Sequence, residues 1–115
     1  MKNKSNEKFL IARRARQTLN FIVKNTENFP VKYSVLKNNI IEECYSMLKN
    51  IYRANILQDI NDKKEIIVNI EMLNYYLDEA LRKNIITKKK FLSYGKYLYE
   101  IDGMVRSWLV YEKSN

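Results

Sequence analysis

The stretch FLSYGKYLYEIDGMVRSW, residues 91–108, decides the fold class. Its main apolar residues stand at positions 91, 94, 98, 101, 105 and 108, so they follow one another in steps of three and four. This spacing places them on one face of an α-helix. Thr87 is a good N-cap residue, and it predicts a helix over about residues 87–113.

Three earlier segments carry the same periodicity and predict helices over about residues 5–27, 32–58 and 62–84. Phe29-Pro30 ends the first of these, because proline lacks a backbone N–H and disfavours helical angles in the residue before it. Asp62, with Glu65 three residues later, has the form of a capping box that starts the third. The expected core stripes are Ala12, Ala15, Leu19 and Ile22; Leu36, Ile40, Cys44, Met47 and Ile51; and Ile66, Ile70, Leu73, Leu77 and Leu81.

The composition argues against sheet folds. The 115 residues include two glycines and one proline, far fewer turn residues than a sheet needs. Apolar residues make up 46% and charged residues 30%, which is typical of a globular domain. We therefore expect one domain over residues 1–115, an all-α, up-down-up-down four-helix bundle.

The chain has no histidine, and this removes many classes of enzyme. A Ser-His-Asp or Cys-His pair and an imidazole zinc site are excluded. Cys44 is the single cysteine, and on a core stripe it is most simply a buried hydrophobe. No signal peptide or membrane span is visible. We expect a cytoplasmic protein without catalytic activity, cofactor, metal or membrane contact.

Charge is the positive indication of a partner. The chain has 21 Lys and Arg against 13 Asp and Glu, a net charge of +8, which favours a polyanion such as nucleic acid. A lysine triple at a helix N-terminus is disfavoured by the helix dipole, which suggests phosphate contact there. An alternative is that the basic residues are only a solvated surface. The candidate nucleic-acid-binding residues are Arg13, Arg14, Arg16, Arg82, Lys83, Lys88, Lys89 and Lys90.

No aromatic residue alternates with these basic groups, as base stacking on a single strand needs. Contact is therefore expected through phosphates, with similar affinity for RNA and DNA and a strong dependence on salt.

Two helices carry a second apolar stripe beside the core stripe. The extra residues are either a generous core with tyrosine hydroxyls in water, or the interface of a homo-oligomer. The candidate interface residues are Ile41, Tyr45, Leu48 and Tyr52 in the second helix and Tyr97, Met104 and Tyr111 in the fourth.

Three short motifs carry a family resemblance: Phe29-Pro30, Ile85-Ile86-Thr87 and the segment from Glu100 to Trp108. They resemble the accessory variability determinant proteins of diversity-generating retroelements, within the wider group named "four helix bundle protein". The last segment matches at Glu100, Ile101, Met104 and Trp108. It departs from the family at Asp102, Arg106 and Ser107, where glycine is usual, and Asp78 stands where an arginine is frequent.

The resemblance implies a pentameric, positively charged barrel without catalytic residues. Such a barrel partners a reverse transcriptase and its template RNA during mutagenic copying to cDNA. Two alternatives stay open: a stand-alone RNA-binding bundle, similar to the proteins encoded in ribosomal RNA intervening sequences, and a structural oligomer whose charge is compositional.

Overall fold

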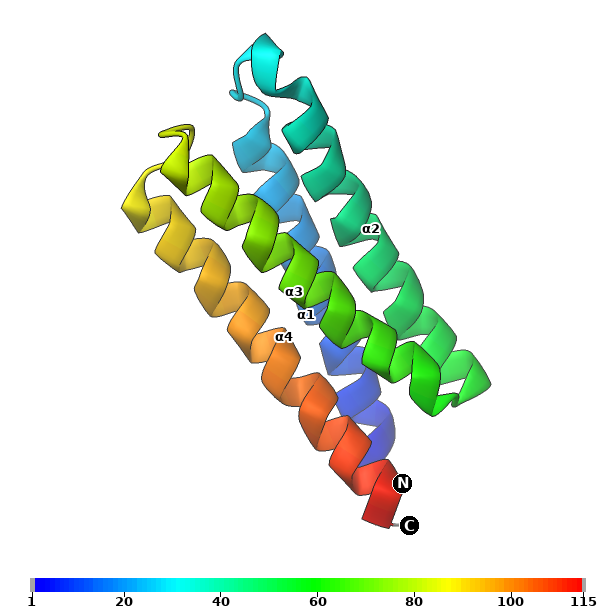
Figure 1. Cartoon of the computed structure of the whole chain (residues 1–115). Coiled ribbons are helices and arrows are strands. Elements are labelled where there is room, and N and C mark those ends of the chain that lie inside the picture. Colours follow the sequence, from blue (N-terminus) through cyan, green and yellow to red (C-terminus); the bar gives the residue numbers. More distant parts are fainter. Residues whose placement is uncertain (1, 115) are drawn as a thin grey trace.

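Four helices form an antiparallel bundle in the computed structural model, which describes the backbone of residues 2–114 and the side chains of residues 10–111 (Figure 1). The helices pack around a ring, α1 on α2, α2 on α3, α3 on α4 and α4 on α1. The bundle measures 48 × 23 × 19 Å. The elements are α1 (Lys2–Thr26), the short 3-10 helix η1 (Val31–Tyr33), α2 (Ser34–Leu57), α3 (Ile60–Arg82) and α4 (Lys88–Ser114).

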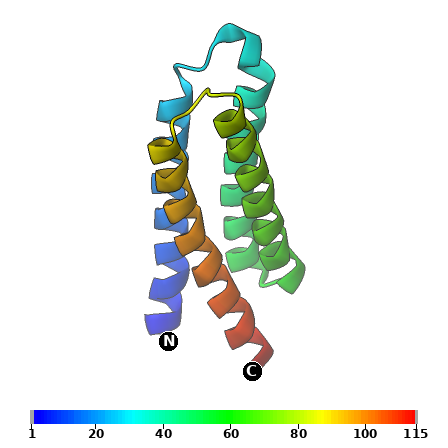
Figure 2. The ribbon, with the colours of Figure 1, turned by 60° about the vertical axis from the view of Figure 1, so that its left-hand side comes forward.

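The connections divide the bundle into two different ends (Figure 2). The α1–α2 and α3–α4 connections lie together at one end, which we call the loop end. The start of α1, the α2–α3 connection and the end of α4 lie at the other, which we call the terminal end. This alternation is the up-down-up-down order that short connections impose on neighbouring helices.

The core stripes predicted from periodicity are confirmed. Every residue of the α1 and α2 stripes is buried, as are Ile66, Ile70, Leu73 and Leu77 on α3. On α4 the buried residues are Tyr94, Leu98, Ile101, Val105 and Trp108. Leu81 and Phe91 are partly buried and pack against this core. Among the described helices, none is long and apolar enough to cross a membrane.

The start of α3 differs from the prediction. The N-cap is Asp59, whose carboxylate accepts a hydrogen bond of 2.9 Å from the backbone N–H of Asn61. The capping box at Asp62 is therefore wrong, because Asp59 offers the same cap three residues earlier and lets Ile60 begin the helix. Asp62 lies in the first turn, where its carboxylate is 3.3 Å from Nε of Arg53.

The other helix ends agree with the prediction within a few residues. Thr87 caps α4, since its hydroxyl accepts a hydrogen bond of 3.1 Å from the backbone N–H of Lys90. Helix α1 ends at Thr26, just before Phe29-Pro30. The chain after Pro30 forms η1 before α2 begins at Ser34, two residues later than expected. The α2–α3 connection is short because Gln58 takes a left-handed conformation, with φ of 54°.

Candidate interaction surfaces

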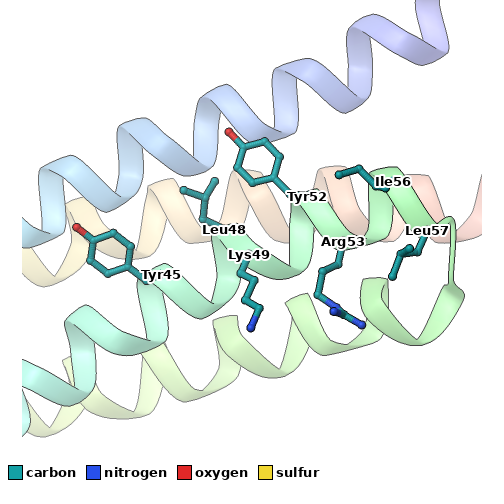
Figure 3. Close-up of a pocket in the computed structure, with 7 residues that line it drawn as sticks. All are labelled: Tyr45, Leu48, Lys49, Tyr52, Arg53, Ile56 and Leu57. Atoms are coloured by element: carbon teal, nitrogen blue, oxygen red, sulfur yellow. The ribbon is translucent and has the colours of Figure 1, made fainter.

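An open groove of about 510 Å³ lies along the outer side of α2. Figure 3 shows that Tyr52 points toward α1, whereas Lys49 and Arg53 point toward α3. We call this surface the α2 groove, and it includes three of the residues predicted to form an oligomer interface. Its lining residues are Tyr45, Leu48, Lys49, Tyr52, Arg53, Ile56 and Leu57.

The predicted interface residues of α2 differ in their exposure to solvent and in their contacts within the protomer. Tyr45 is 54% exposed and Tyr52 is 40% exposed. The hydroxyl of Tyr52 accepts a hydrogen bond of 2.6 Å from the guanidinium of Arg16, so this ring also ties α2 to α1. Leu48 packs against the core, and Ile41 is partly buried. The exposed apolar area of the groove therefore comes mainly from Tyr45 at one end and from Ile56 and Leu57 at the other.

Most of the predicted interface residues of α4 pack against other residues of the same protomer. The ring of Tyr97 lies 5.0 Å from the ring of Phe21 on α1, and Met104 packs against the core. Tyr111 is about half exposed. Of this stripe, Tyr111 is the residue with most surface left for a second chain, and its role in an interface stays a prediction.

The arginine triple of α1 does not form one basic surface. Nε of Arg14 lies 3.4 Å from a carboxylate oxygen of Glu100 on α4, while Arg16 donates to Tyr52 on α2. Residues two apart on a helix point about 200° away from each other, so these side chains reach opposite neighbours. Arg13 lies exposed between them.

The cations of the α3–α4 connection lie together at the loop end, as the sequence predicts. Arg82 is ion-paired with Asp78 at 2.9 Å, and Lys83 with Glu79 at 2.8 Å. These exposed pairs on one helix are weak, so a phosphate can compete with them. The side chains of Lys88, Lys89 and Lys90 are exposed, and none is ion-paired with a carboxylate among residues 10–111.

The loop end also contains an aromatic residue that sequence reasoning missed. The ring centroid of Tyr33, in η1, lies 5.2 Å from the ammonium of Lys32 and 5.8 Å from that of Lys83. A hydrogen bond and the negative charge of Glu79 raise the pKa of Lys83, so this ammonium stays charged at neutral pH. No aromatic residue alternates with the basic groups along the sequence, but the fold brings Tyr33 beside Lys83, 50 residues later in the chain.

A buried cation at the terminal end was also missed. Lys63 is 1% exposed, and its ammonium lies 4.6 Å from the ring centroid of Trp108. Such a contact offsets part of the cost of taking a charge out of water. Trp108 was correctly predicted as a core residue. Lys63 stands three residues before Ile66 and so continues the stripe of α3, which is the signal in the sequence for its burial.

A polar network joins α2 and α3 inside the bundle. Asn69 is buried, and its amide donates to a carboxylate oxygen of Glu43 at 2.6 Å and to Ser46 at 3.2 Å. Its carbonyl oxygen accepts a hydrogen bond of 2.8 Å from Asn50. A satisfied buried amide of this kind fixes the register of two helices. The signal in the sequence is an asparagine beside the apolar stripe of α3.

Residues 10–111 contain neither a metal-ligating cluster nor a reactive thiol. Among residues 10–111 no group of three His, Cys, Asp or Glu side chains could hold a metal ion. Burial raises the pKa of the Cys44 thiol to about 12, with a smaller contribution from Glu43, so this thiol is protonated and unreactive at neutral pH. The absence of enzymatic activity and of a cofactor stays a prediction.

Known proteins resemble this chain in fold. No family model matches the chain, and no curated protein matches it. A solved structure with the same fold is a protein of unknown function from the S23 ribosomal protein family of Bacteroides thetaiotaomicron VPI-5482. The TM-score is 0.81 at 18% sequence identity, over 90% of this chain and 97% of the other. At this identity the likeness shows a shared four-helix architecture.

Proposed function

We propose that the protein is a non-catalytic, self-associating bundle that binds nucleic acid through its loop end, in support of a reverse transcriptase. The observation that carries nucleic-acid binding is the exposed lysine triple Lys88–Lys90 on a chain of net charge +8. Three ammonium groups at a helix N-terminus repel one another and the positive end of the helix dipole. A polyanion relieves both repulsions.

Phosphate contact is the mode of binding that these side chains suit. Lysine ammoniums are point charges on flexible stems, which neutralise phosphates without reading the edges of bases. Neutralised phosphates release their counterions, so affinity falls as salt rises. RNA and DNA of the same length are expected to bind with similar affinity.

Self-association is proposed through the α2 groove, with a second copy of this chain as occupant. The groove exposes Tyr45 at one end and Ile56 and Leu57 at the other, and tyrosine is typical of interfaces. The family resemblance points to five copies. At +8 each, five copies carry about +40, a self-repulsion that bound nucleic acid offsets.

The reverse transcriptase partner is proposed from the resemblance in Phe29-Pro30, Ile85-Ile86-Thr87 and residues 100–108. The gene neighbourhood tests this part directly. A neighbouring reverse transcriptase gene and a pair of repeats that differ at adenines support the proposal, whereas their absence contradicts it.

A stand-alone RNA-binding bundle is the second candidate. The solved protein with the same fold belongs, by its description, to an S23 ribosomal protein family, and this name favours an RNA partner without a polymerase. Tight, salt-insensitive binding of one RNA would favour this candidate over the first.

The experiment for the first candidate measures the affinity of the full chain for single-stranded RNA and DNA of equal sequence at several salt concentrations. We expect a straight line on a log–log plot, with a slope of about −0.7 for each phosphate neutralised. Equal slopes for RNA and DNA support phosphate contact. No binding at low salt would leave the structural oligomer as the better account.

Light scattering tests self-association. We expect a particle several times the 13.9 kDa of one chain. Tyr45→Lys with Ile56→Lys should yield a smaller, still helical species, because both side chains are exposed in the protomer, Ile56 at 74%. Val68→Lys on α3, also exposed, is the matched control. A monomeric wild-type protein would contradict self-association.

A further inference from the structure

Tyr33 is an aromatic ring surrounded by cations at the loop end. Its centroid lies 5.2 Å from Nζ of Lys32 and 5.8 Å from Nζ of Lys83. Tyr33 is partly exposed and is not among the residues that pack against the hydrophobic core. The ring is therefore held near the surface by the η1 turn and its lysine neighbours, and its burial contributes little to folding.

The cluster is assembled from two connections that are distant in the sequence. Tyr33 belongs to the α1–α2 connection, whereas Lys83 ends α3. Figure 2 shows both connections at the same end of the bundle. The lysines of residues 88–90 begin the next helix a few residues after Lys83, so the ring and five lysines lie at one end of the molecule.

An aromatic ring beside several flexible cations suits a nucleotide better than a phosphate alone. Any base can stack on such a ring, and the cations neutralise the flanking phosphates. A lysine ammonium over a ring is held weakly at an exposed site. When a base stacks on Tyr33, Lys32 or Lys83 can leave the ring face and contact a phosphate, because each ammonium ends a flexible four-carbon chain.

We infer that Tyr33 stacks on a base of single-stranded nucleic acid, while Lys32, Lys83 and Lys88–Lys90 bind the adjacent phosphates. This inference rests on the proposed nucleic-acid binding and adds the class of substrate, because paired bases inside a duplex do not present their faces to the ring. Selection among the four bases is not expected, since stacking tolerates all of them.

The test uses a short single-stranded oligonucleotide in which 2-aminopurine replaces one adenine. The fluorescence of this base is quenched when it stacks on an aromatic ring. We expect Tyr33→Ala to weaken binding about 5- to 150-fold and to remove the quenching that is caused by the protein. Tyr33→Phe should retain both, because the stacking ring remains. Tyr99→Ala removes a tyrosine that is 79% exposed on α4 and serves as the matched control, with no expected effect.

The results separate this inference from the proposed function. If Tyr33→Ala binds and quenches like the wild type, while affinity still falls with salt, stacking is overturned and phosphate binding stands. If a duplex of the same length binds as tightly as the single strand, the substrate class is overturned. If wild-type protein binds neither, the proposed function itself fails. Circular dichroism of each variant checks that the helices are intact.

Discussion

The two ends of the bundle use the same residue type in opposite ways. At the terminal end, Lys63 is 1% exposed and its ammonium lies over the ring of Trp108. At the loop end, Lys88, Lys89 and Lys90 are exposed, and none is ion-paired with a described carboxylate. The difference lies in what the neighbouring helix supplies. Helix α4 places a large ring opposite Lys63, whereas the first turn of α4 leaves its three lysines exposed.

This comparison shows that a count of basic residues overstates the number of cations available to bind a polyanion. Arg14 and Arg16 are engaged with Glu100 and Tyr52, and Arg53 with Asp62. These cations tie helices together: carboxylates partly offset the charges of Arg14 and Arg53, while Arg16 is held by a hydrogen bond to a neutral hydroxyl. Lys88, Lys89 and Lys90 are exposed and have no ion pair with a carboxylate among residues 10–111, so they are the better candidates for a polyanion.

The largest expected effect is the loss of Trp108 from the terminal end. Trp108→Ala should lower the free energy of unfolding by about 3–5 kcal/mol, because it leaves a cavity and removes the ring under Lys63. This is a large part of the roughly 5–15 kcal/mol that stabilises a domain. Leu92→Ala, at an exposed site near the loop end, is the control and should cost less than about 0.5 kcal/mol. Thermal unfolding followed by circular dichroism measures both, and equal melting temperatures would contradict the described register of α4.

The second effect compares one lysine from each end. Lys63→Ala should lower the free energy of unfolding by about 2 kcal/mol, since it removes a desolvated cation–π contact and buried methylene groups. Lys89→Ala should change it by less than about 0.5 kcal/mol. Denaturant unfolding of both variants checks the difference. Lys63→Met keeps the aliphatic length without the charge, and it separates packing from the charge contact. Equal losses in the free energy of unfolding for Lys63→Ala and Lys89→Ala would contradict the structural role of Lys63 at the terminal end.

The third effect concerns binding. Changing Lys88, Lys89 and Lys90 together to Gln should reduce the salt slope of single-strand binding by about 2, one phosphate contact per lysine, with unchanged stability. Changing Arg13, Arg14 and Arg16 to Gln should reduce the slope by less than 1, because two of these arginines are engaged with Glu100 and Tyr52. A larger effect of the arginine variant would move the binding surface from the loop end to α1.

The smallest effect is that of pH on binding at the loop end. The chain has no histidine, and Glu79 raises the pKa of Lys83 above its ordinary value of 10.5. Lys83 therefore keeps its charge as pH rises through the neutral range. Affinity for a single strand should change by less than about twofold between pH 6 and pH 9 at constant salt. A marked loss of affinity below pH 9 would show that the cations which bind nucleic acid titrate earlier, and that the loop-end lysines are not responsible.

Most of the fold could be predicted from the sequence, because helical periodicity and end signals are local properties. The stripe from Ile40 to Ile51 and the cap at Thr87 follow from residues within a few turns of one another. The start of α3 was misplaced for the same local reason. Asp59 and Asp62 are both acceptable N-cap residues, and which of them caps the helix depends on whether Ile60 is part of it. The lysines of the α3–α4 connection were predicted together because one loop joins them.

What the sequence by itself determined is therefore the number of helices, their buried faces, their order and the positive charge. Tertiary structure alone decided the partners of that charge. Tyr33 meets Lys83, Lys63 meets Trp108, and Arg14 meets Glu100, each across a separation of more than 40 residues. The physical reason is that periodicity states which face of a helix is buried. It does not state the rotation of each helix about its axis or the axial shift between two packed helices. These decide whether a cation contacts a ring, a carboxylate or water.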